Sequence, residues 1–348
     1  DKFKVLGLCH HNTVVIPGVS VESIDLRKKD QVERLISKFS PDIIIHCASL
    51  TKVDYCEENP EEATAANVDL TQNLVGCIEK DSRVKFIFIS TDSVYGENEG
   101  LQHTEKITAP CNVYGKTKLQ GEKVVVGIPN SLILRTNIFG WNIQNKNSLG
   151  EWILHELKQR SQIGGFKDAF FSTIYTFELA RIIDTSIRND IAGVYNCASR
   201  DFCSKFDFAV KLADMFGFDK NLINSIVLNQ HNFKAKRSKD LSLCVDKIEI
   251  ALGFQLPSID FSMEQFYRDY QRQLPLDIKS NNTQIEHGLK KIPYGRQWIN
   301  AEDISAIDAV LKSPNLTQGP KVAEFEEALK SVTGAGYAVA VNSGTSAL

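Results

Sequence analysis

The sequence lacks the features typical of membrane proteins, disulfide-bonded secreted proteins and nucleic-acid-binding proteins. No apolar run approaches the roughly 20 residues that a membrane span needs. The eight cysteines are scattered without a CxxC pair and no signal-like segment opens the chain, so we expect reduced thiols, packed as small buried hydrophobes, in a cytoplasmic protein. The 40 basic and 43 acidic residues nearly cancel, and the longest basic block is the short stretch 234–239. Neither a nucleic acid nor a membrane is therefore an expected partner.

What the sequence does contain is an alternation of strand-like and helix-like segments. A chain of 348 residues has room for two domains of roughly 100–200 residues each. Short apolar runs alternate with segments whose apolar residues recur at helical spacing, which is typical of parallel strands joined by crossover helices. The predicted strands are 4–9, 43–47, 85–90 and 131–134, and the predicted helices are 28–39, 61–80 and 114–126. We therefore expect an α/β fold with a doubly wound, Rossmann-like parallel sheet.

Small or polar residues follow the predicted strands. In doubly wound sheets, ligands bind beyond the carboxyl ends of the strands. The residues found there are Asp25 and Leu26, the run Cys47, Ala48 and Ser49, the run Ser90, Thr91 and Asp92, and the run Arg135, Thr136 and Asn137. These positions are where the sequence predicts a binding site.

The rest of the chain is organised differently. Helical patterns at 149–160, 177–188, 205–216 and 262–272, with short extended pieces between them, predict a small α/β substrate lobe packed on the sheet. A polar stretch at 279–284 then reads as a linker. Beyond it come predicted helices at 301–312 and 321–330 and an apolar run at 337–341. We expect a first domain at 1–275, a linker at 276–290 and a further segment at 291–348.

Tyr114 and Lys118 form a pair suited to proton transfer. Tyr114 is the only tyrosine with a lysine four residues later, and this spacing puts both side chains on one face of a helix. An ammonium group beside a phenol would favour the phenolate and lower the phenol pKa from about 10. The hydroxyl groups of Ser90 and Thr91, at the end of a predicted strand, could hold a substrate oxygen. Together these residues predict proton transfer at a carbonyl or alcohol oxygen.

The segment from Phe3 to about Arg272 resembles the extended short-chain dehydrogenase/reductases, within the dTDP-4-dehydrorhamnose reductase group and its sugar-nucleotide-binding relatives. The resemblance rests on many motifs in the same order. They are Asp25-Leu26 after the second strand, the segments 40–49 and 51–54, Asn67 in the following helix, and the segments 88–96, 112–118, 134–140, 193–199 and 252–254.

The resemblance implies a role for each matched residue. Thr91 would orient the sugar carbonyl, Tyr114 would give or take the proton, and Lys118 would tune Tyr114 and hold the nicotinamide ribose. Asp25 and Leu26 would contact adenine of NADP or NAD. The remaining residues implied in the cofactor site are Cys47, Ala48, Ser49, Asn67 and Ser90. A hydride would come from the cofactor.

Two substrate contacts are predicted from chemistry and position. Asn137 leaves a strand end inside the expected cleft, and the guanidinium of Arg237 suits a sugar diphosphate. The expected partner is thus a nucleotide-linked sugar, and the protein could form a homo-oligomer.

Two departures from the family pattern leave alternatives open. Ser93 stands where the reductases usually carry an aromatic residue, as in many sugar-nucleotide epimerases and dehydratases. The Gly-rich turn that holds the pyrophosphate in the family does not precede residues 4–9, so we expect that a strand, a turn and a helix of about 25–30 residues are missing. A non-catalytic dinucleotide- or sugar-nucleotide-binding subunit would explain such a loss, and a chain without the turn should bind dinucleotide poorly.

The residues after the first apolar run bear on the cofactor. An acidic residue there would favour NAD by binding the ribose 2′-hydroxyl, but the sequence has His10, His11 and Asn12, so NADP is slightly preferred. Adjacent histidines on a strand point to opposite faces, and no cysteine or carboxylate cluster accompanies them, so no metal site is expected.

The last segment, 291–348, resembles the beginning of the DegT/DnrJ/EryC1 sugar aminotransferases, and most of all the transaminases that make UDP-4-amino-4,6-dideoxy sugars. The resemblance implies that Gly344, Thr345 and Ser346 begin a cradle for the phosphate of pyridoxal phosphate (PLP), and that the Schiff-base lysine would lie downstream of Leu348. We expect an enzyme of deoxyamino-sugar biosynthesis whose sequence is cut at both ends, with PLP serving only a complete aminotransferase domain.

Overall fold

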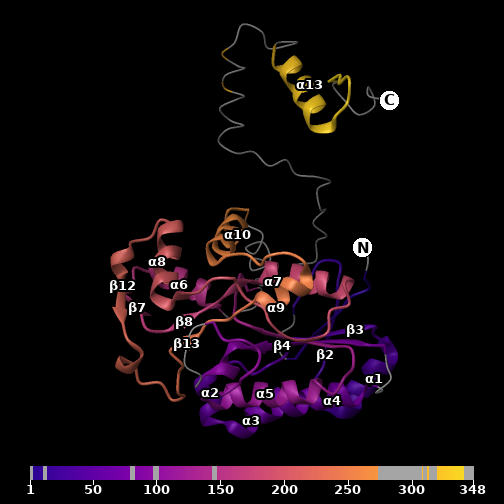
Figure 1. The fold of residues 1–348 in the computed structure, drawn as a ribbon, viewed down its shortest axis with the longest axis vertical. Coiled ribbons are helices and arrows are strands. Elements are labelled where there is room, and N and C mark those ends of the chain that lie inside the picture. Colours follow the sequence, from indigo (N-terminus) through magenta and orange to yellow (C-terminus); the bar gives the residue numbers. More distant parts are fainter. Residues whose placement is uncertain are drawn as a thin grey trace, which may run out of the picture. The chain divides into compact units, whose positions relative to one another are not determined.

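The computed structural model describes residues 3–10, 14–78, 83–96, 102–142, 147–272 and 320–340, together with Asp308 and Lys312 (Figure 1). The chain divides into two compact units, Asp1–Ile285 and Glu286–Leu348. In the second unit, the described helix is α13 (Pro320–Thr333). The first unit carries the candidate site.

The first unit is built on a parallel sheet of four strands in the order β10-β5-β4-β3 (Figure 1). Its strands are β3 (Ile43–His46), β4 (Lys85–Thr91), β5 (Ser131–Thr136) and β10 (Gly193–Asn196). All pairings in it are parallel. The predicted α/β fold with a parallel sheet is therefore confirmed.

The two faces of the sheet are buried by different helices. Phe86, Phe88 and Ile133 pack in one cluster, on the side covered by α1 (Lys29–Phe39), α4 (Leu70–Gly76) and α5 (Val113–Val125). Ile87 and Leu132 pack in another, on the side of α7 (Thr176–Arg188) and α9 (Asp246–Leu252). Because successive side chains on a strand point to opposite faces, the apolar runs of β4 and β5 bury both faces at once.

A second pair of parallel strands lies outside this sheet. β1 (Leu6–Cys9) pairs with β2 (Ser20–Ser23). Among the described residues, no strand pairing joins β1 or β2 to the four-stranded sheet. Leu8 on β1 and Ile45 on β3 are 41% and 46% exposed, although both belong to apolar runs.

The region predicted as one long helix, 61–80, is helical without a break from Pro60 to Gly76, but it contains a π-helical turn. The described structure has α2 (Val53–Glu58), α3 (Pro60–Thr64), a π-helical turn η1 (Ala65–Asp69) and α4. Pro60 starts a new helix because its ring lacks the amide hydrogen needed to continue the previous one. Asn67 lies in the π turn, and such turns are frequent at functional sites.

The remaining lobe of the first unit packs around Phe139, Phe208 and Phe266. Its helices are α6 (Leu149–Lys158), α8 (Lys205–Met215) and α10 (Ile259–Gln271). A short 3-10 helix, η2 (Asp92–Tyr95), directly follows β4. The short elements of the lobe are β6 (Ile138–Phe139), β7 (Ile163–Phe166), β8 (Phe170–Phe171), β9 (Ile174–Tyr175), β11 (Cys203–Ser204), η3 (Lys220–Leu222), β12 (Ile223–Ile226), η4 (Leu228–Gln230) and β13 (Asp240–Leu241). Among the described helices, none has the length and apolar character required to cross a membrane.

Candidate active site

A cleft of about 1020 Å³ opens at the carboxyl ends of β3, β4 and β5. Eight of the predicted site residues line it: Cys47, Ser49, Ser90, Thr91, Tyr114, Lys118, Asn137 and Arg237. Four others, Asp25, Leu26, Ala48 and Asn67, are not part of its lining. The structure thus brings the predicted catalytic residues together and places part of the predicted adenine end elsewhere.

Local hydrogen bonds fix Thr91 and Tyr114 at the cleft. Thr91 ends β4, and its hydroxyl accepts the backbone N–H of Ser93 at 3.2 Å. Asn112 caps α5 by accepting the N–H of Gly115 at 2.9 Å, so Tyr114 lies in the first turn. A Cβ at Gly115 would come within 2.3 Å of the Ser93 carbonyl oxygen, so only glycine lets α5 approach η2 this closely.

Tyr114 itself is half-buried and differs from the expectation in its ionisation. Burial raises its pKa above the usual value, and the charge of Asp92 acts in the same direction, whereas a hydrogen bond with Thr91 opposes them. The expected lowering of the phenol pKa by Lys118 is therefore wrong for the protein without ligands. The neutral phenol is the form that can donate a proton.

Lys118 points away from the phenol toward the strands. Its ammonium donates to the Ile89 carbonyl oxygen at 2.8 Å and lies 4.2 Å from the centre of the Phe88 ring. Burial lowers the pKa of Lys118 to about 8, and the charge of Glu122 opposes this. The Ile89 contact holds the lysine beside the cleft, which it lines.

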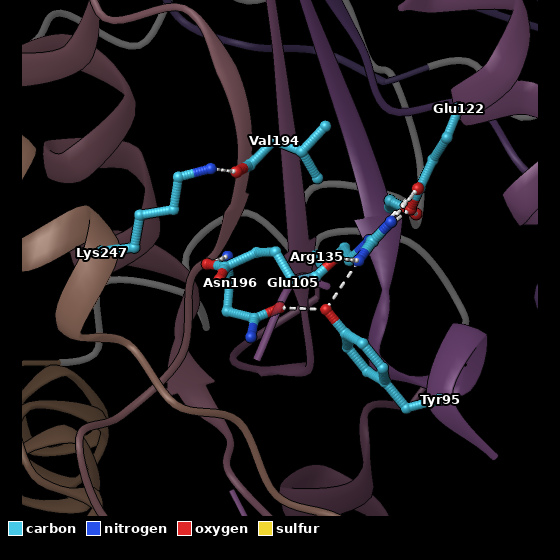
Figure 2. A network of polar contacts seen from close by, with 8 residues as sticks. Tyr95, Glu105, Glu122, Arg135, Val194, Asn196 and Lys247 are labelled. Carbon is cyan, nitrogen blue, oxygen red and sulfur yellow. Dashed lines mark hydrogen bonds and ion pairs between the residues drawn. The ribbon is translucent and has the colours of Figure 1, made fainter. Parts of the chain in front are cut away.

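A buried polar network, which the sequence reasoning missed, braces these elements (Figure 2). Arg135 on β5 contacts Glu122 on α5 through Nε and Nη2, the latter at 2.7 Å, and its Nη1 donates to the Tyr95 hydroxyl at 2.7 Å. Tyr95 in turn donates to the Asn196 Oδ1 at 2.7 Å. The hydroxyl of Ser90 donates to Glu122 and is thereby committed to the network. No local pattern in the sequence indicates this network, because its partners lie from 13 to 101 positions apart.

Asp92 lies deeper in the cleft than its neighbours, at 2% exposure. It accepts hydrogen bonds from the Thr91 hydroxyl at 3.0 Å and from the Asn137 amide at 2.7 Å. Burial raises its pKa. Lys205, the first residue of α8, also lines the cleft, and its charge favours ionised Asp92. No pattern in the sequence distinguished Lys205, because a lysine at the start of a helix usually lies in solvent.

The predicted diphosphate contact, Arg237, is already paired. Its Nη2 lies 2.8 Å from the Asp54 Oδ2, and its guanidinium carbon lies 4.8 Å from the centre of the Phe233 ring. The Ala235 N–H also donates to Asp54 at 2.9 Å. These contacts hold the segment before β13 against α2 at the cleft.

The predicted dinucleotide residues divide into lining and supporting groups. Cys47 and Ser49 line the cleft. Asn67 is buried and holds the loop from behind, since its Oδ1 accepts the Ser49 hydroxyl at 2.9 Å and the Leu50 N–H at 2.8 Å. Its Nδ2 also donates to the Thr117 hydroxyl on α5 at 3.0 Å. Asn67 therefore links the loop after β3 to the helix that carries Tyr114.

Asp25 and Leu26 have other contacts in the described structure. Hydrogen bonds from Arg27 lower the pKa of Asp25 to about 2, and His10 lies 3.7 Å from its carboxylate. Leu26 packs against the core beneath the sheet. Cys47 is exposed, so the expectation of a buried thiol is wrong there, whereas Cys56 and Cys197 are buried as expected.

The cleft fits the nicotinamide end of a dinucleotide, because Tyr114, Lys118, Cys47 and Ser49 converge on one hollow. The described residues include no Gly-rich turn for the pyrophosphate. His11, Asn12 and the predicted phosphate-cradle residues Gly344, Thr345 and Ser346 lie outside the described residues.

Comparison with known proteins agrees with this geometry. Residues 5–272 match the RmlD substrate binding domain, and residues 297–348 match the DegT/DnrJ/EryC1/StrS aminotransferase family. A probable low-salt glycan biosynthesis reductase, Agl14, from Haloferax volcanii is 29% identical over 72% of this chain and 86% of its own length. The methionine adenosyltransferase 2 subunit beta of Pongo abelii is 27% identical over 68% of this chain and 73% of its own length.

The fold also matches a solved structure. The dTDP-4-dehydrorhamnose reductase of Bacillus anthracis str. Ames, in complex with NADP, superimposes with a TM-score of 0.66 at 26% identity, covering 72% of this chain and 90% of that one. With the motifs and the parallel sheet, these matches establish that the chain belongs to the RmlD substrate binding domain family through residues 5–272, with a DegT/DnrJ/EryC1/StrS aminotransferase segment following it.

Proposed function

We propose that the first unit reduces the 4-keto group of a nucleotide-linked 6-deoxy sugar with NADPH, in the biosynthesis of a deoxyamino sugar. The convergence of Thr91, Tyr114 and Lys118 on one cleft carries the proposal. A neutral phenol beside a hydroxyl is the arrangement that protonates a developing alkoxide. The aminotransferase segment supports the same pathway type, because sugar aminotransferases act on ketones.

In this proposal each residue acts at a stated atom. The bound nicotinamide supplies the hydride for the carbonyl carbon. Thr91 Oγ1 and Tyr114 Oη hold the sugar oxygen, and Tyr114 gives it a proton. Lys118 holds the nicotinamide ribose, with Cys47 and Ser49 along the dinucleotide and Asn67 supporting their loop. Asn137 and Arg237 bind the sugar and the diphosphate, and Arg237 leaves Asp54 to do so.

The coenzyme preference follows from charge. His10 follows β1, where a carboxylate would bind the ribose 2′-hydroxyl of NAD, so NADP is the proposed coenzyme. Asp25 and Leu26 would contact the adenine. We also propose the domain limits 1–275 and 291–348 with a linker at 276–290, a cytoplasmic location and PLP as the coenzyme of a complete aminotransferase domain, with Gly344, Thr345 and Ser346 at its phosphate.

Two alternatives have specific support. Ser93 favours a nucleotide-sugar epimerase or dehydratase, because it replaces the aromatic residue usual in the reductases. The resemblance to a protein named as a subunit favours a non-catalytic binding role. The complete set of Thr91, Tyr114 and Lys118 argues against the second alternative, since a binding subunit has no need for a proton donor.

The test uses the native full-length protein with NADPH and either dTDP-4-dehydrorhamnose or a UDP-linked 4-keto-6-deoxy sugar. We expect NADPH oxidation that depends on the sugar and is faster with one nucleotide than with the other. Tight NADPH binding with no turnover of either sugar would contradict the proposal and favour the binding subunit.

A further inference from the structure

Three lysine or arginine side chains line the cleft in the part of the chain that the structure describes, and two of them already have partners. The Lys118 ammonium donates to the Ile89 carbonyl oxygen at 2.8 Å. The Arg237 guanidinium lies 2.8 Å from the Asp54 carboxylate. The third side chain belongs to Lys205, the first residue of α8. Lys205 is therefore the cation that the cleft has available for a ligand.

The ammonium group of Lys205 is half-buried and lacks a polar partner. Within the described residues, no hydrogen bond or ion pair reaches it, and it lies 5.5 Å from the centre of the Phe171 ring. A ring attracts a cation but leaves its donor hydrogens unused. Asp92, whose charge acts on Lys205, already accepts hydrogen bonds from Thr91 and Asn137. An anion bound beside Lys205 would supply the missing partner.

A small three-stranded sheet fixes the position of Lys205. Its central strand is β8, between β11 and β13. Lys205 directly follows β11, and its N–H donates to the Ala169 carbonyl oxygen at 3.0 Å. On the other side, the Phe170 N–H donates to the carbonyl oxygen of Lys239, two residues after Arg237, at 2.8 Å. The segments that carry Lys205 and Arg237 are thus brought to the same end of this sheet.

The first turn of α8 presents Lys205 to the cleft. Ala209, four residues later, also lines the cleft. Because residues four apart share one face of a helix, this face of α8 borders the cleft and carries Lys205 at its amino end. Lys211, on the same helix, is not part of the cleft lining and pairs with Asp260 instead.

The substrate class of the proposed function has one strongly anionic group. The ring of a nucleotide-linked 6-deoxy sugar is uncharged, and its diphosphate carries the negative charge. Hydrogen bonds between ammonium or guanidinium groups and phosphate oxygens are among the strong ones in proteins. Arg237 alone is a poor match for a diphosphate, because Asp54 offsets its charge.

We propose that Lys205 binds the diphosphate of the nucleotide-linked sugar, as a substrate-binding residue beside Arg237. The inference rests on the proposed function and deepens it. Lys205 donates from Nζ to a phosphate oxygen. The diphosphate then lies between α8 and the segment before β13, and the sugar extends from it toward Thr91 and Tyr114.

The test measures the binding of a nucleoside diphosphate without catalysis. Native full-length protein is titrated calorimetrically with dTDP, with UDP and, separately, with NADPH. Lys205→Met keeps an unbranched side chain against Phe171 and removes the charge. We expect its affinity for the better-bound nucleoside diphosphate to fall by about tenfold to a hundredfold, the range for a hydrogen bond between charged groups. NADPH affinity and the melting temperature should stay near wild type, and Lys205→Arg should recover part of the loss.

Lys211→Met is the matched control, because it removes the same charge from the same helix outside the cleft. It should leave both affinities unchanged. In turnover assays, Lys205→Met should raise KM for the nucleotide sugar by a larger factor than it lowers kcat. If Lys205→Met binds the nucleoside diphosphate as tightly as the wild type, or if its NADPH affinity falls equally, the assignment of Lys205 is wrong.

Failure of the proposed function gives a different result. Wild-type protein that binds a nucleoside diphosphate through Lys205 but does not reduce the sugar would contradict the reduction and support the assignment of Lys205. Wild-type protein that binds neither dTDP nor UDP would overturn the nucleotide-sugar substrate, and the assignment of Lys205 with it.

Discussion

The strands β4 and β5 carry a buried polar cluster at each end, and the two clusters differ in how they are closed. At the amino end, the Lys85 ammonium donates to Asn130 at 2.9 Å and to Asp190 at 3.0 Å, but the Asp190 side chain is 80% exposed. At the carboxyl end, Glu122 and Arg135 are 4% and 6% exposed and face each other at 2.7 Å.

The two clusters differ in their access to water, which indicates different roles. The amino-end cluster reaches water through Asp190, so it can tie the strands together and be lost at little cost. The carboxyl-end cluster has no such access and connects the segments that carry Thr91, Tyr114 and Lys118 (Figure 2). A buried ion pair is a poor source of stability by itself but is costly to break on one side. We infer that the ion pair between Glu122 and Arg135 holds the segments around the cleft in position.

The largest effect should come from Tyr114→Phe, which removes the proton donor and leaves both clusters intact. We expect kcat to fall by about a thousandfold, within the range for general acid catalysis. NADPH affinity and the melting temperature should stay near wild type. Turnover that survives this change would show that another group protonates the sugar.

Breaking each cluster in turn tests the comparison directly. Arg135→Met leaves Glu122 as an unpaired buried charge and should cost about 3–5 kcal/mol in the free energy of unfolding. Lys85→Met removes the matched cation at the other end and should cost about 1 kcal/mol. Urea denaturation of the two variants measures both.

The activities of these two variants sharpen the contrast. At a temperature where both are folded, Arg135→Met should lose kcat as well as stability, whereas Lys85→Met should keep kcat and KM. Equal losses of kcat in the two variants would mean that the carboxyl-end cluster has no special relation to the cleft.

Asn67→Ala should have a smaller effect, on stability and on cofactor binding. Asn67 bonds to Ser49, Leu50 and Thr117, so its loss should cost about 1–3 kcal/mol of stability. The loosened loop should weaken NADPH binding by about tenfold, which corresponds to about 1.4 kcal/mol. Calorimetric titration with NADPH measures this. An unchanged dissociation constant would exclude the loop after β3 from the cofactor site.

The smallest effect is a shift in pH dependence. Because burial lowers the pKa of Lys118 to about 8, activity that needs its ammonium should fall as pH rises through that value. Glu122→Gln also leaves Arg135 unpaired, so it is measured at a temperature where the variant is folded. There it should move this fall of activity to lower pH, since the Glu122 charge holds the proton on Lys118. Lys85→Met should leave the pH at which activity falls unchanged. If activity falls at the same pH in Glu122→Gln as in the wild type, a group other than Lys118 titrates there.

The same pKa has a consequence for stability. An unfolded lysine titrates near 10.4, so between about pH 8 and that value the unfolded chain binds more protons than the folded one. The contribution of Lys118 to the free energy of unfolding therefore rises with pH across this window. Activity and stability should move in opposite directions there.

Patterns local in the sequence predicted the sheet and the catalytic residues. The apolar runs at 43–47, 85–90 and 131–134 became β3, β4 and β5. For β4 and β5 the reason is that strands buried on both faces must be apolar throughout. Tyr114 and Lys118 were predictable because their spacing fixes a shared helical face.

What the sequence did not predict depends on contacts between distant segments. The bond from Tyr95 to Asn196 joins residues 101 positions apart, and Arg237 meets Asp54 across 183. Lys205 approaches Asp92 only because α8 packs beside the cleft. The contact of Lys118 with the Ile89 carbonyl oxygen joins residues 29 positions apart, and the raised pKa of Tyr114 follows from burial rather than from spacing.

The most direct test of the central claim follows the hydride. Native full-length protein is incubated with NADPH that carries deuterium at the transferable position and with a nucleotide-linked 4-keto-6-deoxy sugar, and the product is examined by NMR. We predict deuterium on C4 of the sugar, with one NADPH consumed for each sugar reduced. Sugar that is epimerised or dehydrated with no net consumption of NADPH would contradict the assignment as a reductase.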